Sequence, residues 1–310
     1  MVKIFFTDMY ENFNCEIFTR IFDRIGIDYV VSKDPDFLIY GPFGYEYMQY
    51  DCARIFWTGE NISPDFSQCD YAIGFDYIEF GDRYIRYPLY NFYYEELNKA
   101  SKKHLMVQDD YCNRSFCSFV VSNSDCRVRN HFFQMINTYK HVDSGGMYMN
   151  NIGGRIQNKL EFQNKYKFSV TFENCQYPGY VTEKIVEGFA SCTIPIYWGD
   201  PTIFREFNKD AFVYVRDEGD FDKVIEKIKI LDSDNNLYMQ YLRSDINAKS
   251  KKYEDKINSF FEHIFKQPAD KAIRRNENSF ARTRNAGLKK VYSVNNYFKK
   301  LKRVFKNSAN

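Results

Sequence analysis

Five side chains that could bind a charged ligand occur close together in the sequence: Glu173, Asn174, Tyr180, Glu183 and Lys184. The surrounding residues predict a buried strand at Phe168–Phe172, then a Pro-Gly turn, a helix and a second strand at Thr193–Tyr197. In open α/β sheets, ligands bind outside the carboxyl ends of the strands, where a helix N-terminus favours anions. A lysine at the start of that helix adds a full positive charge. The segment therefore predicts a site for a phosphorylated ligand.

The first hundred residues alternate apolar stretches with a stretch of helical periodicity. Strands are expected at Lys3–Thr7, Tyr29–Val31, Phe37–Tyr40 and Arg54–Trp57, and a helix at Cys15–Ile25. This alternation is typical of a parallel sheet that is covered on both faces. The polar residues 98–110 are expected to connect this half to a second domain.

A second alternation begins with a buried strand at Phe116. It continues with a helix at Arg127–Tyr139, a glycine-rich loop up to Gly154, and a helix at Lys159–Lys165. Beyond the segment described first, the sequence predicts one more strand and two helices, at Ala211–Val215, Phe221–Leu231 and Leu237–Ala248. We therefore expect an α/β protein with two Rossmann-like halves.

Two blocks of this sequence closely resemble motifs of the bacterial α-1,3/4-fucosyltransferases. One block reads Phe172-Glu173-Asn174, then a short gap, then Gly179-Tyr180-Val181-Thr182-Glu183-Lys184; the other is the stretch 56–66. The resemblance covers roughly residues 50–215. It implies the GT-B fold, with two Rossmann-like domains facing across a cleft. The expected division is an acceptor-binding domain at 1–105, a GDP-fucose-binding domain at 106–270 and a basic tail at 271–310.

Sugar transfer from a nucleotide needs a base for the incoming hydroxyl and cations for the departing phosphates. Glu60, which follows the strand Arg54–Trp57, aligns with the catalytic base of the family. Its alternative role is a capping or surface carboxylate. Arg129 matches a family arginine on the first helix of the nucleotide domain, and Lys184 lies in the signature. A guanidinium fork and an ammonium group suit phosphate oxygens, although Arg129 could instead be a solvated helix residue.

The remaining polar residues of the signature suit hydrogen bonding to the donor. Asn174, Tyr180 and Glu183 are expected around the nucleotide ribose and the fucose ring, and Glu183 could instead stabilise positive charge on the sugar. Glu173 is the weaker candidate, since it could equally be a buried structural carboxylate.

The sequence gives little support for a metal site. Asp34 and Asp36, like Asp232 and Asp234, match the Asp-x-Asp pattern of metal-dependent glycosyltransferases, but we interpret both pairs as turns. The histidines have no ligand spacing, and no two of the eight cysteines form a C-x-x-C pair. We expect no required cofactor, with a divalent metal at most stimulatory.

The residues after 270 differ in charge from the rest of the chain. They hold twelve Lys or Arg against Glu277 alone, a local charge of +11, which leaves −9 for the preceding residues. Five apolar residues form a stripe along a helix: Val291, Val294, Phe298, Leu301 and Phe305. Such a helix could bind an anionic membrane, pack on the body or a second copy, or bind nucleic acid. The resemblance favours the membrane, so no nucleic-acid partner is expected.

These observations together predict an inverting α-1,3-fucosyltransferase. The resemblance implies that it moves L-fucose from GDP-β-L-fucose to the N-acetylglucosamine or glucose of a β-galactoside such as N-acetyllactosamine, giving Lewis-type glycans. The alternatives are a GT-B enzyme that uses another nucleotide sugar, and a non-catalytic glycan- or polyanion-binding protein. A cytoplasmic location is expected, peripheral on the inner face of the membrane if the tail binds lipid. The O3 or O4 linkage and the oligomeric state stay open.

Aromatic residues make up 19% of the chain, an unusually large share. Aromatic side chains suit surfaces on which sugar rings stack. They are spread along the whole chain rather than clustered, which favours the simpler interpretation that a compositional bias fills the cores with Phe and Tyr.

Overall fold

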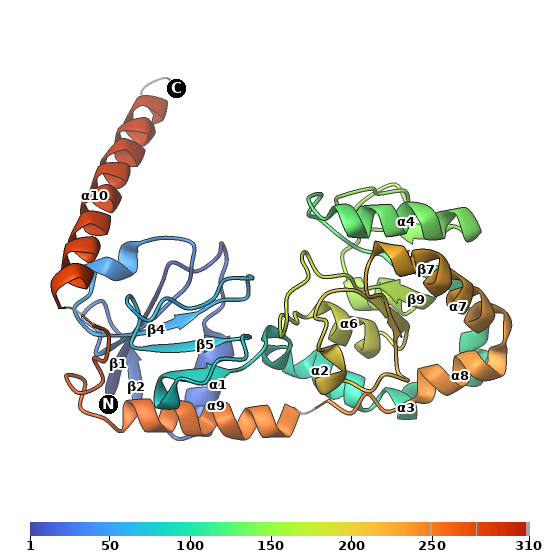
Figure 1. The fold of residues 1–310 in the computed structure, drawn as a ribbon, viewed down its shortest axis with the longest axis horizontal. Coiled ribbons are helices and arrows are strands. Elements are labelled where there is room, and N and C mark those ends of the chain that lie inside the picture. Colours follow the sequence, from blue (N-terminus) through green and yellow to red (C-terminus); the bar gives the residue numbers. More distant parts are fainter. Residues whose placement is uncertain (249, 277, 308–310) are drawn as a thin grey trace. The chain divides into compact units, whose positions relative to one another are not determined.

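The computed structural model describes residues 1–248, 250–276 and 278–307, and the chain forms two compact units (Figure 1). Unit 1 comprises Met1–Gly74, Ile78–Arg86 and the described residues from Asp255 on. Unit 2 comprises Phe75–Tyr77 and Tyr87–Glu254. This division differs from the predicted boundaries at residues 105 and 270.

Unit 1 is built on a six-stranded parallel sheet with the order β2-β1-β3-β4-β5-β6. Its strands are β1 (Val2–Thr7), β2 (Tyr29–Val31), β3 (Phe37–Tyr40), β4 (Ala53–Trp57), β5 (Tyr71–Gly74) and β6 (Tyr84–Arg86). The four strands that the sequence predicts are confirmed, and β5 and β6 are additions.

Aromatic packing covers one face of the first sheet. There α1 (Glu16–Arg24) lies against α9 (Ser250–Phe265), and the ring of Phe22 contacts those of Phe261 and Phe265 at 5.0 and 5.2 Å. Side chains alternate across a strand, so Leu38 and Tyr40 point to the other face, where they pack with Tyr47 and Met48. Both faces of the sheet are therefore buried.

The same packing explains why the unit boundaries differ from the prediction. The phenylalanines of α9 are buried against the first sheet, which assigns most of this helix to unit 1 although it follows unit 2 in the sequence. The stretch 98–110 is not a connector: α2 (Tyr94–Ser101) packs on α6 (Lys184–Ala190) and continues into α3 (Lys103–Met106), all within unit 2. The chain instead passes between the units near residues 75, 78, 87 and 255.

Unit 2 is built on a five-stranded parallel sheet with the order β11-β10-β9-β7-β8. Its strands are β7 (Ser115–Phe119), β8 (Val142–Ser144), β9 (Tyr166–Val170), β10 (Ile194–Tyr197) and β11 (Val213–Tyr214). The strand predicted at Phe168–Phe172 therefore begins and ends two residues earlier. Strand β8 is an addition to the sequence prediction.

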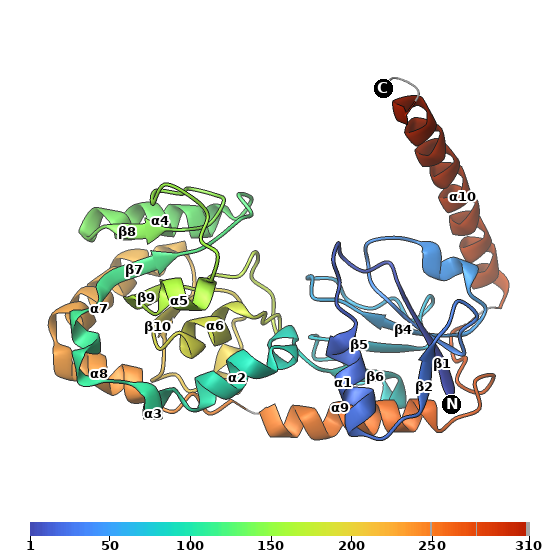
Figure 2. The same ribbon diagram turned by 180° about the vertical axis from the view of Figure 1, so that it is seen from behind.

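Helices cover both faces of the second sheet (Figure 2). On one face, α4 (Arg127–Tyr139), α7 (Phe221–Ser233) and α8 (Asn235–Arg243) share a core with Phe168 and Val170 of β9. On the other face lie α5 (Lys159–Gln163) and α6. Gly188 lets α6 approach the sheet, because a Cβ at this position would come within 2.8 Å of Ser169 Oγ.

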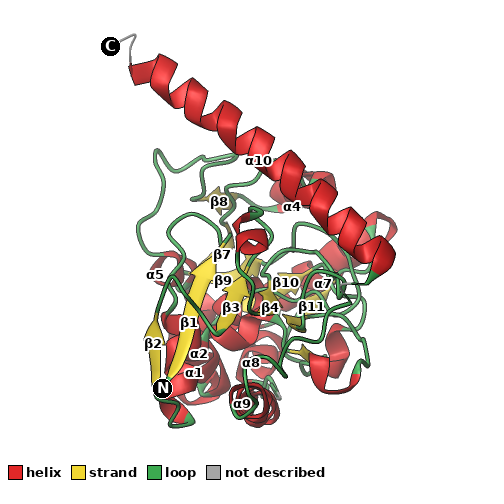
Figure 3. Ribbon diagram, turned by 90° about the vertical axis from the view of Figure 1, so that its left-hand side faces the viewer, coloured by secondary structure: helices red, strands yellow, loops and turns green. Residues whose placement is uncertain are grey.

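The basic segment forms one continuous helix, α10 (Ser279–Asn307), as predicted (Figure 3). Its first turns contact unit 1: Arg284 Nη2 lies 2.8 Å from Asp65 Oδ2, and Gln49 Nε2 donates to Tyr292 Oη at 3.3 Å. Val291 and Val294 are more than half exposed. The apolar residues Phe298, Leu301 and Phe305 lie outside the residues whose side chains the structure describes. No helix in the described ranges combines the length and apolarity that a membrane span requires.

The first residues of the predicted basic tail at 271–310 pack on unit 1 instead of continuing the basic helix. Arg275 is buried, and its Nη1 lies 2.5 Å from Oδ2 of the buried Asp70. Arg274 pairs with Asp82 at 3.0 Å. These arginines fasten the segment to unit 1, so the basic tail begins after them.

Candidate functional site

A cavity of about 370 Å³ lies at the carboxyl edge of the second sheet. Its walls come from the segments that follow three adjacent strands: residues 120–123 after β7, 145–146 after β8, and Asn174 after β9. Residues 155–157, Lys159 and the start of α6 complete the lining. The cavity therefore occupies the predicted place for a ligand in an open α/β sheet.

Lys184 is held at the cavity by a buried carboxylate. Its Nζ donates to Glu173 Oε2 at 3.1 Å and to Thr182 Oγ1 at 2.8 Å, and it lies 3.4 Å from Glu183 Oε1. Thr182 in turn donates to Glu173 from its backbone N–H at 2.8 Å and from its hydroxyl at 2.6 Å. The ammonium group is thus fixed by three oxygens, while 18% of the side chain stays exposed.

The charges of this cluster support one another. Burial would lower the pKa of Lys184, but the carboxylates of Glu173 and Glu183 outweigh burial and raise it. Burial opposes ionisation of Glu183 too, yet Lys184 and Lys159 lower its pKa to about 2. Burial raises the pKa of Glu173, and Lys184 partly offsets that increase. At neutral pH the cavity edge therefore presents a charged lysine beside an ionised Glu183.

Arg129 lies on the first turn of α4 and points its buried guanidinium at the same cavity. Nη1 donates to Asn174 Oδ1 at 3.0 Å and Nη2 donates to the carbonyl of Asn123 at 2.6 Å. The residue is 1% exposed, so the alternative of a solvated helix position is wrong. Its Nε has no partner among the described residues, and burial lowers the pKa of the group. An anion in the cavity would offset this burial.

Glu173 and Tyr180 do not line the cavity. Glu173 is fully buried beneath Lys184, as expected for the structural alternative. Tyr180 is also buried, with its ring 5.2 Å from that of Phe75 in an edge-on arrangement. The cavity thus brings together four of the predicted residues, Arg129, Asn174, Glu183 and Lys184.

Glu60 belongs to unit 1, three residues after the end of β4. Its backbone N–H donates to Thr58 Oγ1 at 2.8 Å, and its carbonyl accepts from Ile62 N at 2.8 Å. These bonds form a turn that leaves the Glu60 side chain exposed. The residue therefore lies at the carboxyl edge of the first sheet, where a ligand-binding residue is expected.

Sequence reasoning missed two basic residues of the cavity, Arg155 and Lys159. Their position depends on the glycine-rich loop, which Asn150 closes by donating to the carbonyls of Gly146 and Gly154 at 2.8 and 2.9 Å. The glycine content of the loop was the available signal. With these residues, the lining holds four basic side chains against the single carboxylate of Glu183, a balance that suits a diphosphate.

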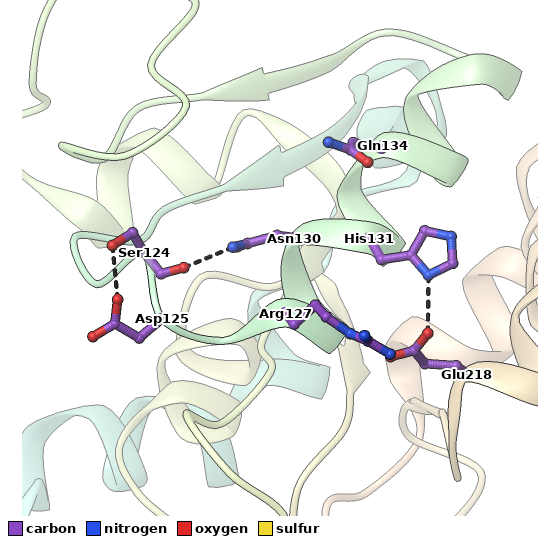
Figure 4. A pocket seen from close by; sticks show the side chains of 7 residues that line it. All are labelled: Ser124, Asp125, Arg127, Asn130, His131, Gln134 and Glu218. Carbon is purple, nitrogen blue, oxygen red and sulfur yellow. Dashed lines mark hydrogen bonds and ion pairs between the residues drawn. The ribbon is translucent and has the colours of Figure 1, made fainter.

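A second hollow, of about 450 Å³, lies at the start of α4 and contains no residue predicted for the site (Figure 4). Its basic side chains contact one carboxylate: His131 Nδ1 lies 3.1 Å from Glu218 Oε2, and Arg127 lies 3.6 Å from the other oxygen. Asn130 Nδ2 donates to the Ser124 carbonyl at 2.7 Å. Because Glu218 already contacts the basic side chains of this hollow, we place the functional site in the other cavity.

Comparison with known proteins agrees with this geometry. Residues 4–93 match the profile of the alpha-(1,3)-fucosyltransferase FucT N-terminal domain. Residues 111–278, more than half of the chain, match the C-terminal profile of glycosyltransferase family 10 (fucosyltransferase).

Individual proteins give the same result. The chain is 38% identical over 256 residues to alpha-(1,3)-fucosyltransferase FucT of Helicobacter pylori, which covers 69% of this chain but 53% of that relative. A crystal structure of an alpha1,3-fucosyltransferase superposes with a TM-score of 0.76 and 29% identity, covering 90% of this chain and 93% of the other. A structure of such an enzyme with GDP-fucose gives a TM-score of 0.73 and 30% identity, covering 89% and 92%.

Proposed function

We propose a fucosyl transfer reaction for this chain, which belongs to glycosyltransferase family 10, the fucosyltransferases, and has their GT-B fold. The observation that carries the proposal is the cavity at the carboxyl edge of the second sheet. There Arg129 is held by hydrogen bonds to Asn123 and Asn174. Lys184 is held by the buried Glu173, and both cations face the space in which a diphosphate would lie. The chain spans about half the length of its curated Helicobacter pylori relative, so the activity is argued from these residues.

GDP-β-L-fucose is the proposed donor. The diphosphate of GDP is a good leaving group once its charge is neutralised, and fixed cations do this without reorganising during the reaction. Arg129 can offer guanidinium N–H groups to phosphate oxygens, and Lys184 adds a point charge. Because these cations are built into the site, we propose that the reaction requires no divalent metal.

The proposed reaction is a single displacement. Glu60 accepts the proton of an acceptor hydroxyl, whose oxygen attacks C1 of fucose while the bond from C1 to the phosphate oxygen breaks. The electron pair of that bond leaves with GDP, and the β-linked donor yields an α-linked product. Glu183 is anionic at the cavity edge, and we assign it to stabilising the positive charge that develops on the sugar ring.

The proposed acceptor is a β-galactoside such as N-acetyllactosamine. Fucose would join O3 of its N-acetylglucosamine or glucose to give a Lewis-type glycan. The sequence resemblance supports the β-galactoside acceptor, and the α-(1,3) linkage in the name of the Helicobacter pylori relative supports O3.

The test is to incubate the full chain with GDP-fucose, N-acetyllactosamine and EDTA and to detect a fucosylated trisaccharide by mass spectrometry. We expect product, with the O3 linkage identified by NMR. Glu60→Gln should lower kcat by about 100-fold or more without changing GDP affinity, because general bases contribute that much. Glu79→Gln, an exposed glutamate on the loop after β5, should retain full activity and serves as the control.

Three results would contradict the proposal in different ways. Near wild-type turnover by Glu60→Gln would remove Glu60 from the chemistry. A preference for UDP over GDP in competition binding would indicate another nucleotide sugar. Glycan or polyanion binding without any GDP binding would indicate a non-catalytic protein.

The basic helix supports a separate proposal, that the protein is cytoplasmic and binds the inner face of an anionic membrane through α10. Val291 and Val294 are exposed next to Lys289 and Lys290, and apolar residues beside lysines suit a lipid interface. Removal of 289–310 should abolish sedimentation with phosphatidylserine vesicles and leave transfer to a soluble acceptor intact. Unchanged sedimentation would exclude this role.

A further inference from the structure

Two exposed aromatic side chains lie together at the carboxyl edge of the first sheet. Tyr10 is 46% exposed and Phe43 is 54% exposed, and their ring centroids are 6.5 Å apart at an interplanar angle of 82°. Large aromatic side chains are usually buried, where they stabilise the fold, so an exposed aromatic pair can mark a binding surface. Neither residue belongs to the site described above.

The position of this pair relates it directly to Glu60. Tyr10, Phe43 and Glu60 each follow the end of a strand by three residues, and the strands concerned, β1, β3 and β4, are neighbours in the sheet. Adjacent strands lie about 4.8 Å apart. Phe43 therefore follows a strand that lies about one strand spacing from the strand of Glu60, and Tyr10 follows a strand about two spacings away. These separations are comparable to the length of a disaccharide.

The loops that carry the two rings are fastened to each other by Asp8. Its carboxylate accepts from the backbone N–H groups of Glu46 and Tyr47 at 3.0 and 2.7 Å, and its carbonyl accepts from Phe43 N at 3.0 Å. A Cβ at Gly41 would come within 2.6 Å of the Asp8 carbonyl oxygen. The backbone of the Phe43 loop is thus set by the Tyr10 loop.

The ring of Tyr10 also packs against aromatic side chains that connect it to the sheet. It packs edge-on against Phe13 at 5.4 Å, and Phe13 contacts Trp57, the last residue of β4, at 5.6 Å. The exposed rings are therefore connected through side chains to the strand that leads to Glu60. A surface that is ordered before its ligand arrives loses less entropy on binding.

We propose that Tyr10 and Phe43 form an aromatic platform for the sugar rings of the acceptor, in which one ring stacks on a sugar face and the other, at 82° to it, contacts the sugar from the side. One face of a galactopyranose ring presents C–H groups, and aromatic π-faces carry the partial negative charge that attracts such groups. A sugar resting on the platform would have its neighbouring ring directed along the sheet edge toward Glu60. The identity of the acceptor rests on the proposed fucosyl transfer, whereas sugar binding by the two rings can be tested without any transfer.

The test uses the double variant Tyr10→Ala/Phe43→Ala of the full chain. We expect the KM for N-acetyllactosamine to rise about tenfold, from the loss of two aromatic contacts, while kcat and the KM for GDP-fucose stay near wild type. Tyr10→Phe retains the ring and should retain the KM. Phe280→Ala removes an exposed aromatic of α10, away from the platform, and is the matched control.

A second measurement needs no transfer. Saturation-transfer NMR with N-acetyllactosamine alone should give signals for the wild type that the double variant loses, while GDP affinity and thermal unfolding report that the variant is folded. An unchanged KM or unchanged NMR signals would overturn the platform. Sugar binding by a wild type that transfers no fucose would instead count against the proposed reaction only. Loss of a wild-type dimer in the double variant, without loss of sugar binding, would identify a second copy as the occupant and also overturn it.

Discussion

At the scale of single residues, the donor site depends on a carboxylate that no ligand would touch. Glu173 is fully buried and accepts hydrogen bonds from Thr182 and Lys184. A lysine side chain is long and flexible, and fixing it costs conformational entropy. The hydrogen bond to Glu173 orders Lys184 when the protein folds, so nucleotide binding does not have to order this side chain. It is a positioning residue for Lys184.

Glu173→Gln should weaken both folding and donor binding. The amide keeps the size of the side chain but removes the charge that holds Lys184, so we expect a loss of about 3 kcal/mol in the free energy of unfolding. Urea denaturation measures that loss, and the KM for GDP-fucose should rise in parallel. Glu226→Gln breaks only an exposed pair with Lys229 and should change stability by less than about 0.5 kcal/mol. Equal effects of the two substitutions would contradict the role of Glu173.

Lys103 provides a prediction about pH. Its Nζ is buried 5.0 Å from the ring of Phe189, without a hydrogen-bond partner among the described residues, and burial lowers its pKa to about 8. The unfolded chain, with the ordinary lysine pKa of 10.5, binds more protons than the folded chain between these values. The contribution of Lys103 to stability therefore increases as the pH rises from about 8 to 10.5.

Lys103→Met should remove this dependence. The variant should be more stable than the wild type at pH 7, by up to about 3 kcal/mol if the full pKa difference is realised. Free energies of unfolding between pH 7 and pH 10 measure the effect. A wild-type slope of stability against pH in the variant would show that Lys103 does not titrate in this window.

At the scale of elements, the prediction succeeded where local patterns determine structure. The apolar runs Tyr29–Val31 and Phe37–Tyr40 form strands with the predicted bounds, and the amphipathic pattern gives α4 its predicted bounds at Arg127–Tyr139. Strand β8 is only three residues long, too short for a periodic signal. Helix α9 was missed, and its assignment to unit 1 depends on partners such as Phe22 and Phe37, which lie more than two hundred residues earlier in the sequence.

The candidate site likewise contains residues that local sequence patterns could place and residues that only the tertiary structure places. Lys184 and Arg129 lie in the first turns of predicted helices, so their placement could be expected. Arg155 and Lys159 reach the cavity only because the loop after β8 folds back on itself. That fold depends on a tertiary contact between Gly146 and the backbone of Val121. The glycines of the loop signal an unusual backbone, but they do not reveal which segment the loop packs against.

Gly146→Ala tests this contact. A Cβ at residue 146 would overlap the backbone of Val121, and a backbone neighbour cannot move as a flexible side chain can. We expect a loss of about 1–3 kcal/mol in stability and weaker GDP binding, measured by calorimetry. Gly154→Ala has open space around its added Cβ and should leave both values near wild type. Unimpaired GDP binding by Gly146→Ala would separate the loop from the donor site.

At the scale of the whole chain, each sheet forms from residues close in sequence, but unit 1 is completed by residues that follow unit 2. The buried Asp70 attaches these later residues to the first sheet. Its Oδ1 accepts from the backbone N–H groups of Arg274 and Arg275 at 2.6 and 2.7 Å, and its Oδ2 accepts from Arg54 N at 2.7 Å and pairs with the Arg275 side chain. One carboxylate thus joins β4 to the segment that precedes α10.

Asp70→Asn should therefore destabilise unit 1 selectively. The amide cannot accept from all four donors, and it removes the buried anion of the Arg275 guanidinium, which keeps only the exposed Asp51 at 3.8 Å. Loss of one partner costs about 3–5 kcal/mol in comparable buried pairs. Differential scanning calorimetry should show a lower Tm for unit 1, while the transition that GDP shifts upward, that of unit 2, keeps its Tm. Asp82→Asn removes the half-exposed partner of Arg274 and should have a much smaller effect. If Asp70→Asn instead lowered both transitions equally, the two units would unfold as one cooperative body, and the closure of unit 1 would stabilise the donor site as well.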